Sequence, residues 1–193
     1  MRKITLAFLL MSLSLVAFAQ KSDQGYAGVY MTKENFINNR LSYKINTADK
    51  GDKLKFIPIA DWTLTIRIVT PDSVQTFKRG TIYGYYENGK VYRYAPPGNL
   101  YAAEDYYRVE DDRGLVIYTS EFNGGSEYYY STDLTAPIQL LNLKNIKRDF
   151  KSQPQFVSAV KRLNKKEVHG ELAKRDSQGN FIINKIYTQS VRK

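Results

Sequence analysis

Carboxylates are the side chains of this sequence that could carry acid–base chemistry. A glycoside hydrolase needs two of them flanking a cleft, one donating a proton and the other acting as nucleophile or base. The acidic residues that could converge in this way are Asp61, Glu104, Asp105, Glu121 and Glu127. Acidic residues are also common beside turns, where their carboxylates are solvated, without any catalytic function. A carboxylate-dependent hydrolase of the cell envelope is therefore an alternative function. The function favoured by the sequence depends on other residues, which are described below.

Other catalytic and metal-binding chemistry has little support in the sequence. The chain has no cysteine, and its one histidine, His169, lies in a lysine-rich stretch. A metal site needs convergent ligands, and a Ser-His-Asp triad needs a histidine oriented by a neighbour. Phosphate-binding glycine loops, nucleophile elbows, zinc-protease motifs and calcium loops are absent from the sequence. We therefore expect no cofactor and no metal, and the sequence favours a protein without catalytic activity.

Tyrosine is the residue type that could carry binding. The chain has 16 tyrosines, of which 12 lie between positions 83 and 130. Asn88-Gly89 between two β-rich runs predicts a hairpin with a two-residue type I′ turn, which fixes the register of the two strands. That register places four rings on one sheet face: Tyr83, Tyr85, Tyr92 and Tyr94. Such a face is either ordinary strand packing or an aromatic platform for a glycan, a peptide or a protein.

Positive charge is concentrated near the C-terminus. The chain has a net charge of +10; residues 144–193 contain 13 Lys or Arg and four Asp or Glu, whereas residues 20–143 contain 14 and 15. These cations could bind an anionic polymer or, more weakly, an anionic membrane surface. We favour the interpretation that these cations form the solvated face of helices. The candidate basic surface consists of Lys144, Lys147, Arg148, Lys161, Arg162, Lys165 and Lys166.

The first part of the chain is expected to form the strands that position these residues. Apolar and polar residues alternate over 41–46 and 63–68, and turn sequences such as Pro71-Asp72-Ser73 separate the runs. This pattern predicts a mainly β fold over residues 20–133, an antiparallel sandwich or a partly open barrel. Thr32-Lys33-Glu34-Asn35-Phe36 predicts a single helical turn near its start, because Thr32 can cap it.

Helices are expected in residues 134–193. Leu143, Ile146 and Phe150 recur at helical spacing after Asn142, and a second helix with a buried stripe starts near Pro154. Residues 164–174 are mostly polar and are expected to be exposed, and residues 181–187 fit either a strand or a helix. We expect this basic helical region to pack on the same domain as the strands, which gives an α+β fold dominated by β structure.

The N-terminus has the pattern of a secretory signal. Arg2 and Lys3 precede an apolar run that ends in Ala17-Phe18-Ala19, so residues 1–19 are expected to be removed before Gln20. The run is too short and too interrupted for a membrane span, and no later run predicts a transmembrane segment. Because no cysteine follows the signal, a lipoprotein is not expected. The sequence predicts a periplasmic or secreted protein, which makes nucleic acid an improbable partner.

Several segments resemble one family. Residues 28–39, GVYMTKENFINN, are similar to an opening segment G-x-Y-x-T/S-x-x-D/E-F-x-N-N, and a Tyr/Gly-rich hairpin follows. Residues 137–147, leading to Gln155-Phe156-Val157, are similar to a closing helical region. With the signal ending Ala-Phe-Ala-Gln, the chain resembles a set of uncharacterised exported proteins from Bacteroidota. The resemblance implies an exported β-rich domain, and it implies no functional residues.

These observations together predict an exported binding or structural module without catalytic activity. Its four-tyrosine face is expected to contact an envelope glycan, a peptide or a partner protein. The alternatives are the hydrolase above and an envelope protein that binds anionic polymer through its basic C-terminal helices.

Overall fold

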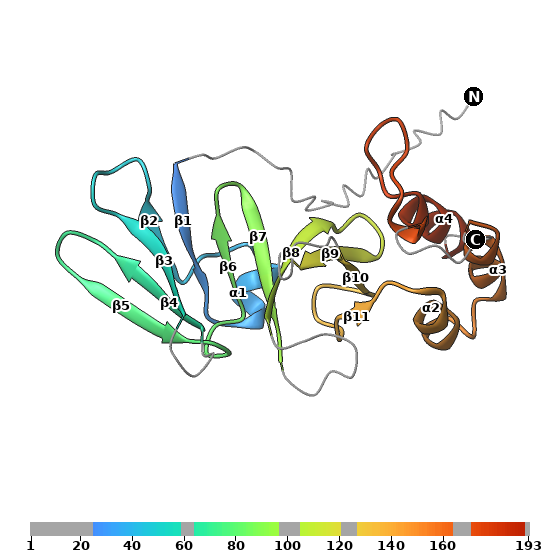
Figure 1. The fold of residues 1–193 in the computed structure, drawn as a ribbon, viewed down its shortest axis with the longest axis horizontal. Coiled ribbons are helices and arrows are strands. Elements are labelled where there is room, and N and C mark those ends of the chain that lie inside the picture. Colours follow the sequence, from blue (N-terminus) through green and yellow to red (C-terminus); the bar gives the residue numbers. More distant parts are fainter. Residues whose placement is uncertain (1–24, 59–63, 97–104, 121–126, 164–170, 192–193) are drawn as a thin grey trace, which may run out of the picture.

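The computed structural model describes residues 25–58, 64–96, 105–120, 127–163 and 171–191 (Figure 1). The elements of the β region are β1 (Tyr26–Tyr30), α1 (Lys33–Ile37), β2 (Tyr43–Asn46), β3 (Lys53–Pro58), β4 (Leu64–Val69), β5 (Val74–Lys78), β6 (Gly84–Glu87), β7 (Lys90–Ala95), β8 (Asp105–Asp111), β9 (Val116–Ser120), β10 (Glu127–Ser131) and β11 (Gln139–Leu140). The C-terminal elements are α2 (Leu143–Asp149), α3 (Pro154–Leu163), the 3-10 helix η2 (Glu171–Ala173) and α4 (Ile182–Val191).

The described strands form two antiparallel sheets. Eight of them make the large sheet, in the order β11-β10-β9-β8-β7-β6-β1-β2, and the other three make a small sheet, β3-β4-β5. The large sheet is open, with β11 and β2 at its ends. The prediction of a mainly β, antiparallel fold with C-terminal helices is confirmed, and the sandwich arrangement describes it better than a barrel.

The small sheet packs on one part of the large sheet. Leu54, Ile66 and Ile68 from β3 and β4 are buried together with Val29 and Tyr85 from β1 and β6. This packing explains the alternation of apolar and polar residues in the sequence. Every second residue of these strands faces the apolar layer between the two sheets.

Part of the opposite face of the large sheet is covered by α1 and by the chain that follows β10. The side chain of Thr32 caps α1 by accepting a hydrogen bond from the Asn35 amide, as the sequence predicts. Phe36 then packs against Tyr30 in an edge-to-face contact of 5.2 Å between ring centroids. Nearby, the buried Arg93 guanidinium donates hydrogen bonds to the Tyr118 hydroxyl and to the Ala136 carbonyl.

The β6–β7 hairpin has the predicted turn and register. Asn88 and Gly89 both have positive φ, at 51° and 77°, as a type I′ turn requires. Tyr85 lies opposite Tyr92, and Glu87 lies opposite Lys90. The prediction that Asn88-Gly89 forms the turn and sets the register of β6 and β7 is therefore confirmed.

The C-terminal helices pack on β9 and β10 at the other end of the molecule (Figure 1). Phe150, Phe156, Val160 and Ile183 are buried there with Ile117 of β9 and other residues of the two strands. Asn142 caps α2 by accepting from the Asn145 amide, as expected. The ambiguous residues 181–187 belong mostly to a helix, α4. Leu172, expected to be exposed, is buried in the same cluster because η2 turns it inward.

No helix in the described ranges is long and apolar enough to cross a membrane.

Candidate functional site

The predicted tyrosine face is largely an internal layer. Tyr85 and Tyr92 are 8% and 9% exposed, their rings stack with centroids 4.3 Å apart, and Phe56 of the small sheet covers Tyr85 at 4.9 Å. Tyr94 is half-buried and contacts Tyr106. A ligand could reach the stacked pair only by displacing the small sheet. The structure gives these rings a packing role, and we place no ligand on them.

Tyr83 does not lie on that face, which corrects the sequence prediction. Its ring packs with Phe36 on the opposite face of the large sheet, and its hydroxyl donates a hydrogen bond to the Leu134 carbonyl. Ile82 takes its place in the cluster around Tyr85. The reason is local, because regular strand structure starts only at Gly84 and the strict alternation assumed from the turn fails before it.

The candidate carboxylates do not form a catalytic pair in the described structure. Asp61, Glu104 and Glu121 lie outside the described residues. Asp105 is paired with Arg79, and Glu127 accepts a hydrogen bond from the Tyr129 hydroxyl. Two described grooves contain carboxylates, with Asp111 and Asp176 in one and Asp112 and Asp133 in the other. Neither groove contains any of the five candidate carboxylates named from the sequence.

Asp112 and Asp133 differ in their electrostatics. Burial, reinforced by the charge of Asp111, raises the pKa of Asp112. Hydrogen bonds from the Thr135 side chain and from the Thr135 and Ala136 amides outweigh burial and lower the pKa of Asp133. Because those bonds shape the turn after β10, Asp133 has a structural function there. His169 lies outside the described residues, and within them no three potential metal ligands of the His, Cys, Asp or Glu type lie together.

The basic residues of the candidate surface have different environments. Lys144, Lys147, Lys161 and Arg162 are exposed, whereas Arg148 pairs with Asp149 and donates to Gln139. Lys165 and Lys166 lie outside the described residues. Lys147, Arg148, Lys161 and Arg162 occupy the last turns of α2 and α3, where cations favour the helix dipole. Arg162 differs from the others in that it also lines a groove.

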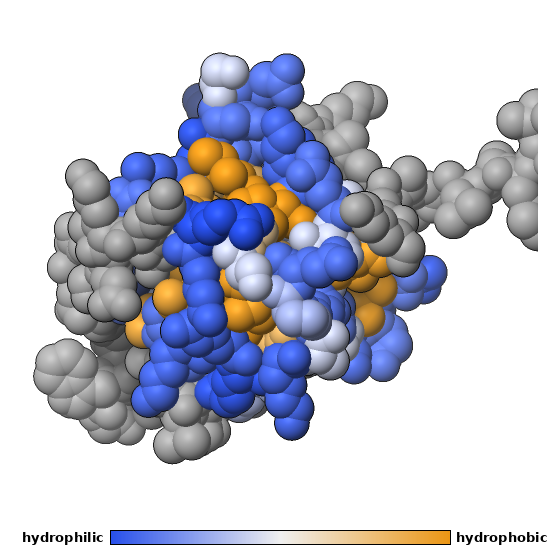
Figure 2. Space-filling view, turned by 90° about the vertical axis from the view of Figure 1, so that its right-hand side faces the viewer, coloured by the Kyte–Doolittle hydropathy of each residue, from blue (hydrophilic) through white to orange (hydrophobic). Residues whose placement is uncertain are grey.

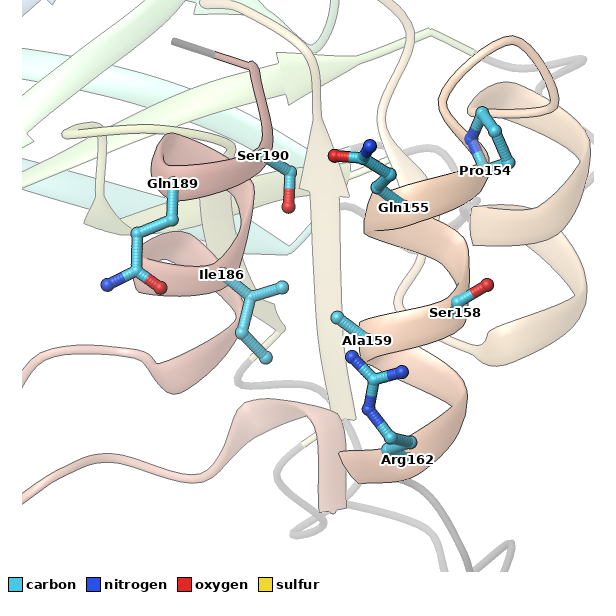
Figure 3. A pocket seen from close by; sticks show the side chains of 8 residues that line it. All are labelled: Pro154, Gln155, Ser158, Ala159, Arg162, Ile186, Gln189 and Ser190. Atoms are coloured by element: carbon cyan, nitrogen blue, oxygen red, sulfur yellow. The ribbon is translucent and has the colours of Figure 1, made fainter. Parts of the chain in front are cut away.

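This groove lies between α3 and α4 and has a volume of about 810 Å³. Figure 3 shows Ile186 and Ser190 of α4 across from Gln155, Ala159 and Arg162 of α3, and Gln189 on the outer side of α4. Pro154 and Ser158 complete the lining. Positions 155, 158, 159 and 162 form one stripe of α3, beside the stripe of Phe156 and Val160 that faces the core.

An aromatic cluster holds the two helices that form the groove. Phe156 of α3 contacts Phe150 at 4.9 Å and Tyr187 of α4 at 5.3 Å between ring centroids, both edge to face. Tyr187 also contacts Phe150 at 5.7 Å. Because Phe150, the C-cap residue of α2, joins residues of α3 and α4 in this cluster, the separation of α3 and α4 is set by packing below the groove.

A buried asparagine anchors α4 to the sheet. The side-chain amide of Asn184 donates to Asp111 Oδ2 at 3.1 Å and to the Leu115 carbonyl at 2.9 Å. Burial tends to raise the pKa of Asp111, but hydrogen bonds from Arg113 and Asn184 outweigh it and lower that pKa. Asp111 is therefore an anion at neutral pH, and its charge strengthens the anchoring hydrogen bond.

The groove lining suits binding better than catalysis. Ala159 and Ile186 provide apolar surface, and Gln155, Gln189, Ser158 and Ser190 can donate and accept hydrogen bonds. Arg162 adds a permanent positive charge at the end of α3. The lining described here contains no carboxylate, histidine or cysteine that could transfer a proton or attack a substrate.

The surface around the groove combines apolar and polar side chains. Figure 2 shows hydrophobic residues gathered in the centre of this end of the molecule, bordered by hydrophilic ones. Half-buried apolar side chains of the helical layer include Val157, Leu163 and Ile186, and Val191 is 44% exposed. An apolar centre within a polar border is the usual anatomy of a protein interface.

Sequence reasoning found Arg162 but missed the α4 side of the groove. Ile186, Gln189 and Ser190 follow a helical spacing of three and four residues, and this spacing is the signal that could have placed them on one helix face. The pairing of α3 with α4 has no signal in a single sequence.

Comparison of the chain with protein-family models, with curated proteins and with solved structures found no match. The geometry of the groove therefore carries the functional argument alone.

Proposed function

We propose that this protein is a binding module without catalytic activity that acts in the periplasm or outside the cell. Its ligand is an acidic polypeptide segment with apolar side chains, held in the groove between α3 and α4. The observation that carries the proposal is the lining of that groove, apolar at Ala159 and Ile186, amide- and hydroxyl-bearing at its sides, and cationic at Arg162.

Charge and shape support a polypeptide ligand. The excess of nine positive charges in residues 144–193 attracts acidic partners and raises their local concentration. The amides of Gln155 and Gln189 match peptide groups, and the apolar surface matches aliphatic side chains. A glycan is less suited, since the groove lining presents no aromatic ring to a sugar face.

The location outside the cytoplasm rests on the sequence. Residues 1–19 have the three parts of a secretory signal, and the expected cleavage site has no cysteine to which a lipid could be attached. The signal lies outside the described residues, so this location stays a prediction.

A binding titration tests the proposal. A fluorescein-labelled peptide of alternating glutamate and leucine is titrated with the mature protein, and its anisotropy is measured; a lysine–leucine peptide serves as the control probe. We expect saturable binding of the acidic peptide only. Arg162→Gln should weaken binding about fivefold, because one charge-assisted contact of an exposed side chain is lost. Ala159→Trp should weaken it further by filling the groove.

The matched control is Lys161→Gln, which removes the same charge from the neighbouring residue of α3 that does not line the groove. If Lys161→Gln weakens binding as much as Arg162→Gln does, the peptide responds to net charge and the groove is not the site.

A further inference from the structure

The small sheet has a second surface, which faces away from the large sheet. Residues directly opposite each other on paired strands share a face, and Leu54, Ile66 and Ile68 point toward the large sheet. The residues that alternate with them therefore point outward. Four of these outward residues are cations, and all four are exposed: Lys53, Lys55, Arg67 and Lys78. We call this surface the cationic sheet face.

No acidic residue balances the cationic sheet face within its strands. β3, β4 and β5 contain no Asp or Glu. In the described turns around them, acids occur at Asp49, Asp52 and Asp72, yet none of the four cations takes part in a recorded ion pair of the described residues.

Two of the cations repel each other directly. Lys55 and Arg67 are opposite residues of β3 and β4, and the next residue in the same row is the uncharged Thr76 of β5. Like charges at opposite positions of a sheet are destabilising. The fold therefore retains a pair of like charges on an exposed face. A bound anion would convert this repulsion into attraction.

We propose that the cationic sheet face binds a linear anionic polysaccharide through its sulfate or carboxylate groups. Neighbouring strands are about 4.8 Å apart, and alternate residues of one strand are about 6.8 Å apart. The cations thus form a two-dimensional array with regular spacing, which suits a chain with regularly repeated negative charge. A membrane suits it less, because Val74 is the one large apolar side chain described as exposed on these strands.

This surface is separate from the groove. The small sheet lies at one end of the long axis of the molecule and α3 and α4 lie at the other (Figure 1). The polysaccharide proposal therefore does not depend on the peptide proposal, and variants at one end leave the other end intact.

Binding to dextran sulfate, with uncharged dextran as the control polymer, tests the proposal. The double variant Lys55→Gln/Arg67→Gln is compared with Lys144→Gln/Lys147→Gln, which makes the same change in net charge on the exposed side of α2. We expect the first variant to weaken dextran sulfate binding by about fivefold or more and the second to have little effect, because exposed charge contacts act mainly over short range.

Thermal unfolding of the same variants gives a second readout. Lys55→Gln/Arg67→Gln should unfold at the same temperature as the wild type or a higher one, because it removes a repulsive pair. Dextran sulfate should raise the unfolding temperature of the wild type more than that of this variant.

Three results would overturn the proposal. The first is no binding of dextran sulfate by the wild type, and the second is equal weakening by both double variants, which would indicate an effect of net charge alone. The third is binding to vesicles of anionic phosphatidylglycerol without binding to the polymer, which would make the face a membrane contact.

Discussion

Tyrosine hydroxyls in this fold connect residues that lie 9 to 51 positions apart in the sequence. Tyr30 donates to Asn39, Tyr83 donates to the Leu134 carbonyl, and Tyr130 donates to Asp149 Oδ2 at 2.6 Å. Each ring packs in an apolar cluster while its hydroxyl finds a partner at the edge of that cluster, as buried tyrosines usually do. The abundance of tyrosine is thus explained in large part by packing.

Tyr130 and Asp149 give a pH-dependent prediction at this scale. Burial raises the pKa of Asp149, but hydrogen bonds from Arg148 and Tyr130 outweigh it and leave that pKa below its ordinary value. A carboxyl group whose pKa is lower in the folded than in the unfolded chain stabilises the fold at pH values above its unfolded pKa. This stabilisation is lost as the pH falls through the folded pKa. Tyr130→Phe should therefore cost about 1 kcal/mol near pH 7, and the difference from wild type should shrink below the ordinary pKa of 3.8.

Urea unfolding at pH 7 and at acid pH measures this difference. The matched control is Tyr187→Phe, which removes a hydroxyl from a ring that also contacts Phe150 and for which the described structure records no hydroxyl hydrogen bond. A constant difference between Tyr130→Phe and wild type at both pH values would contradict the assignment.

Arg93 shows the limit of prediction for single residues. The hairpin register correctly placed it on the face away from Tyr85, but arginine is rarely buried, and its acceptors on Tyr118 and Ala136 lie 25 and 43 residues away in the chain. Only the assembled sheet brings these groups together. The same holds for the groove, where Arg162 could be chosen from its type but its neighbours on α4 could not.

Elements with a local signal were predicted well. The Thr32 and Asn142 caps, the Asn88-Gly89 turn and the apolar stripe of α3 each depend on residues a few positions apart, and all appear as expected. Pairings across longer distances were not predictable. β1 pairs with β6, and the intervening β3, β4 and β5 form their own sheet, whose apolar face is buried against the large sheet.

Gly84 tests how β6 and α1 fit together. A Cβ added at this position would overlap the Tyr92 carbonyl and lie 2.8 Å from the Phe36 ring. Gly84→Ala should therefore destabilise the protein by about 1–3 kcal/mol, the usual cost of overpacking, measured by chemical denaturation.

Gly25→Ala is the control for that substitution, because a Cβ at Gly25 would meet no atom within 4 Å. It should leave stability within about 0.5 kcal/mol of wild type. Equal effects of the two substitutions would mean that the close approach of Phe36 to β6 does not exist in solution.

At the scale of the whole molecule, two surfaces with different chemistry lie at opposite ends. The cationic sheet face carries exposed lysine and arginine side chains, whereas the groove between α3 and α4 combines apolar, amide and cationic groups (Figure 3). Sequence analysis placed the positive charge in the C-terminal region and treated the β region as nearly neutral. The net charge of the β region is indeed close to zero, but it does not indicate the cationic sheet face. The acidic residues that balance these cations lie outside β3, β4 and β5.

Amide hydrogen exchange of the mature protein, with and without a saturating amount of the glutamate–leucine peptide, tests the central claim most directly. Binding in the groove should slow exchange in residues 154–162 and 186–191 and leave β3, β4 and β5 unchanged, because ligand contact suppresses local opening. Protection confined to the small sheet, or no protection in α3 and α4 at saturation, would contradict the account.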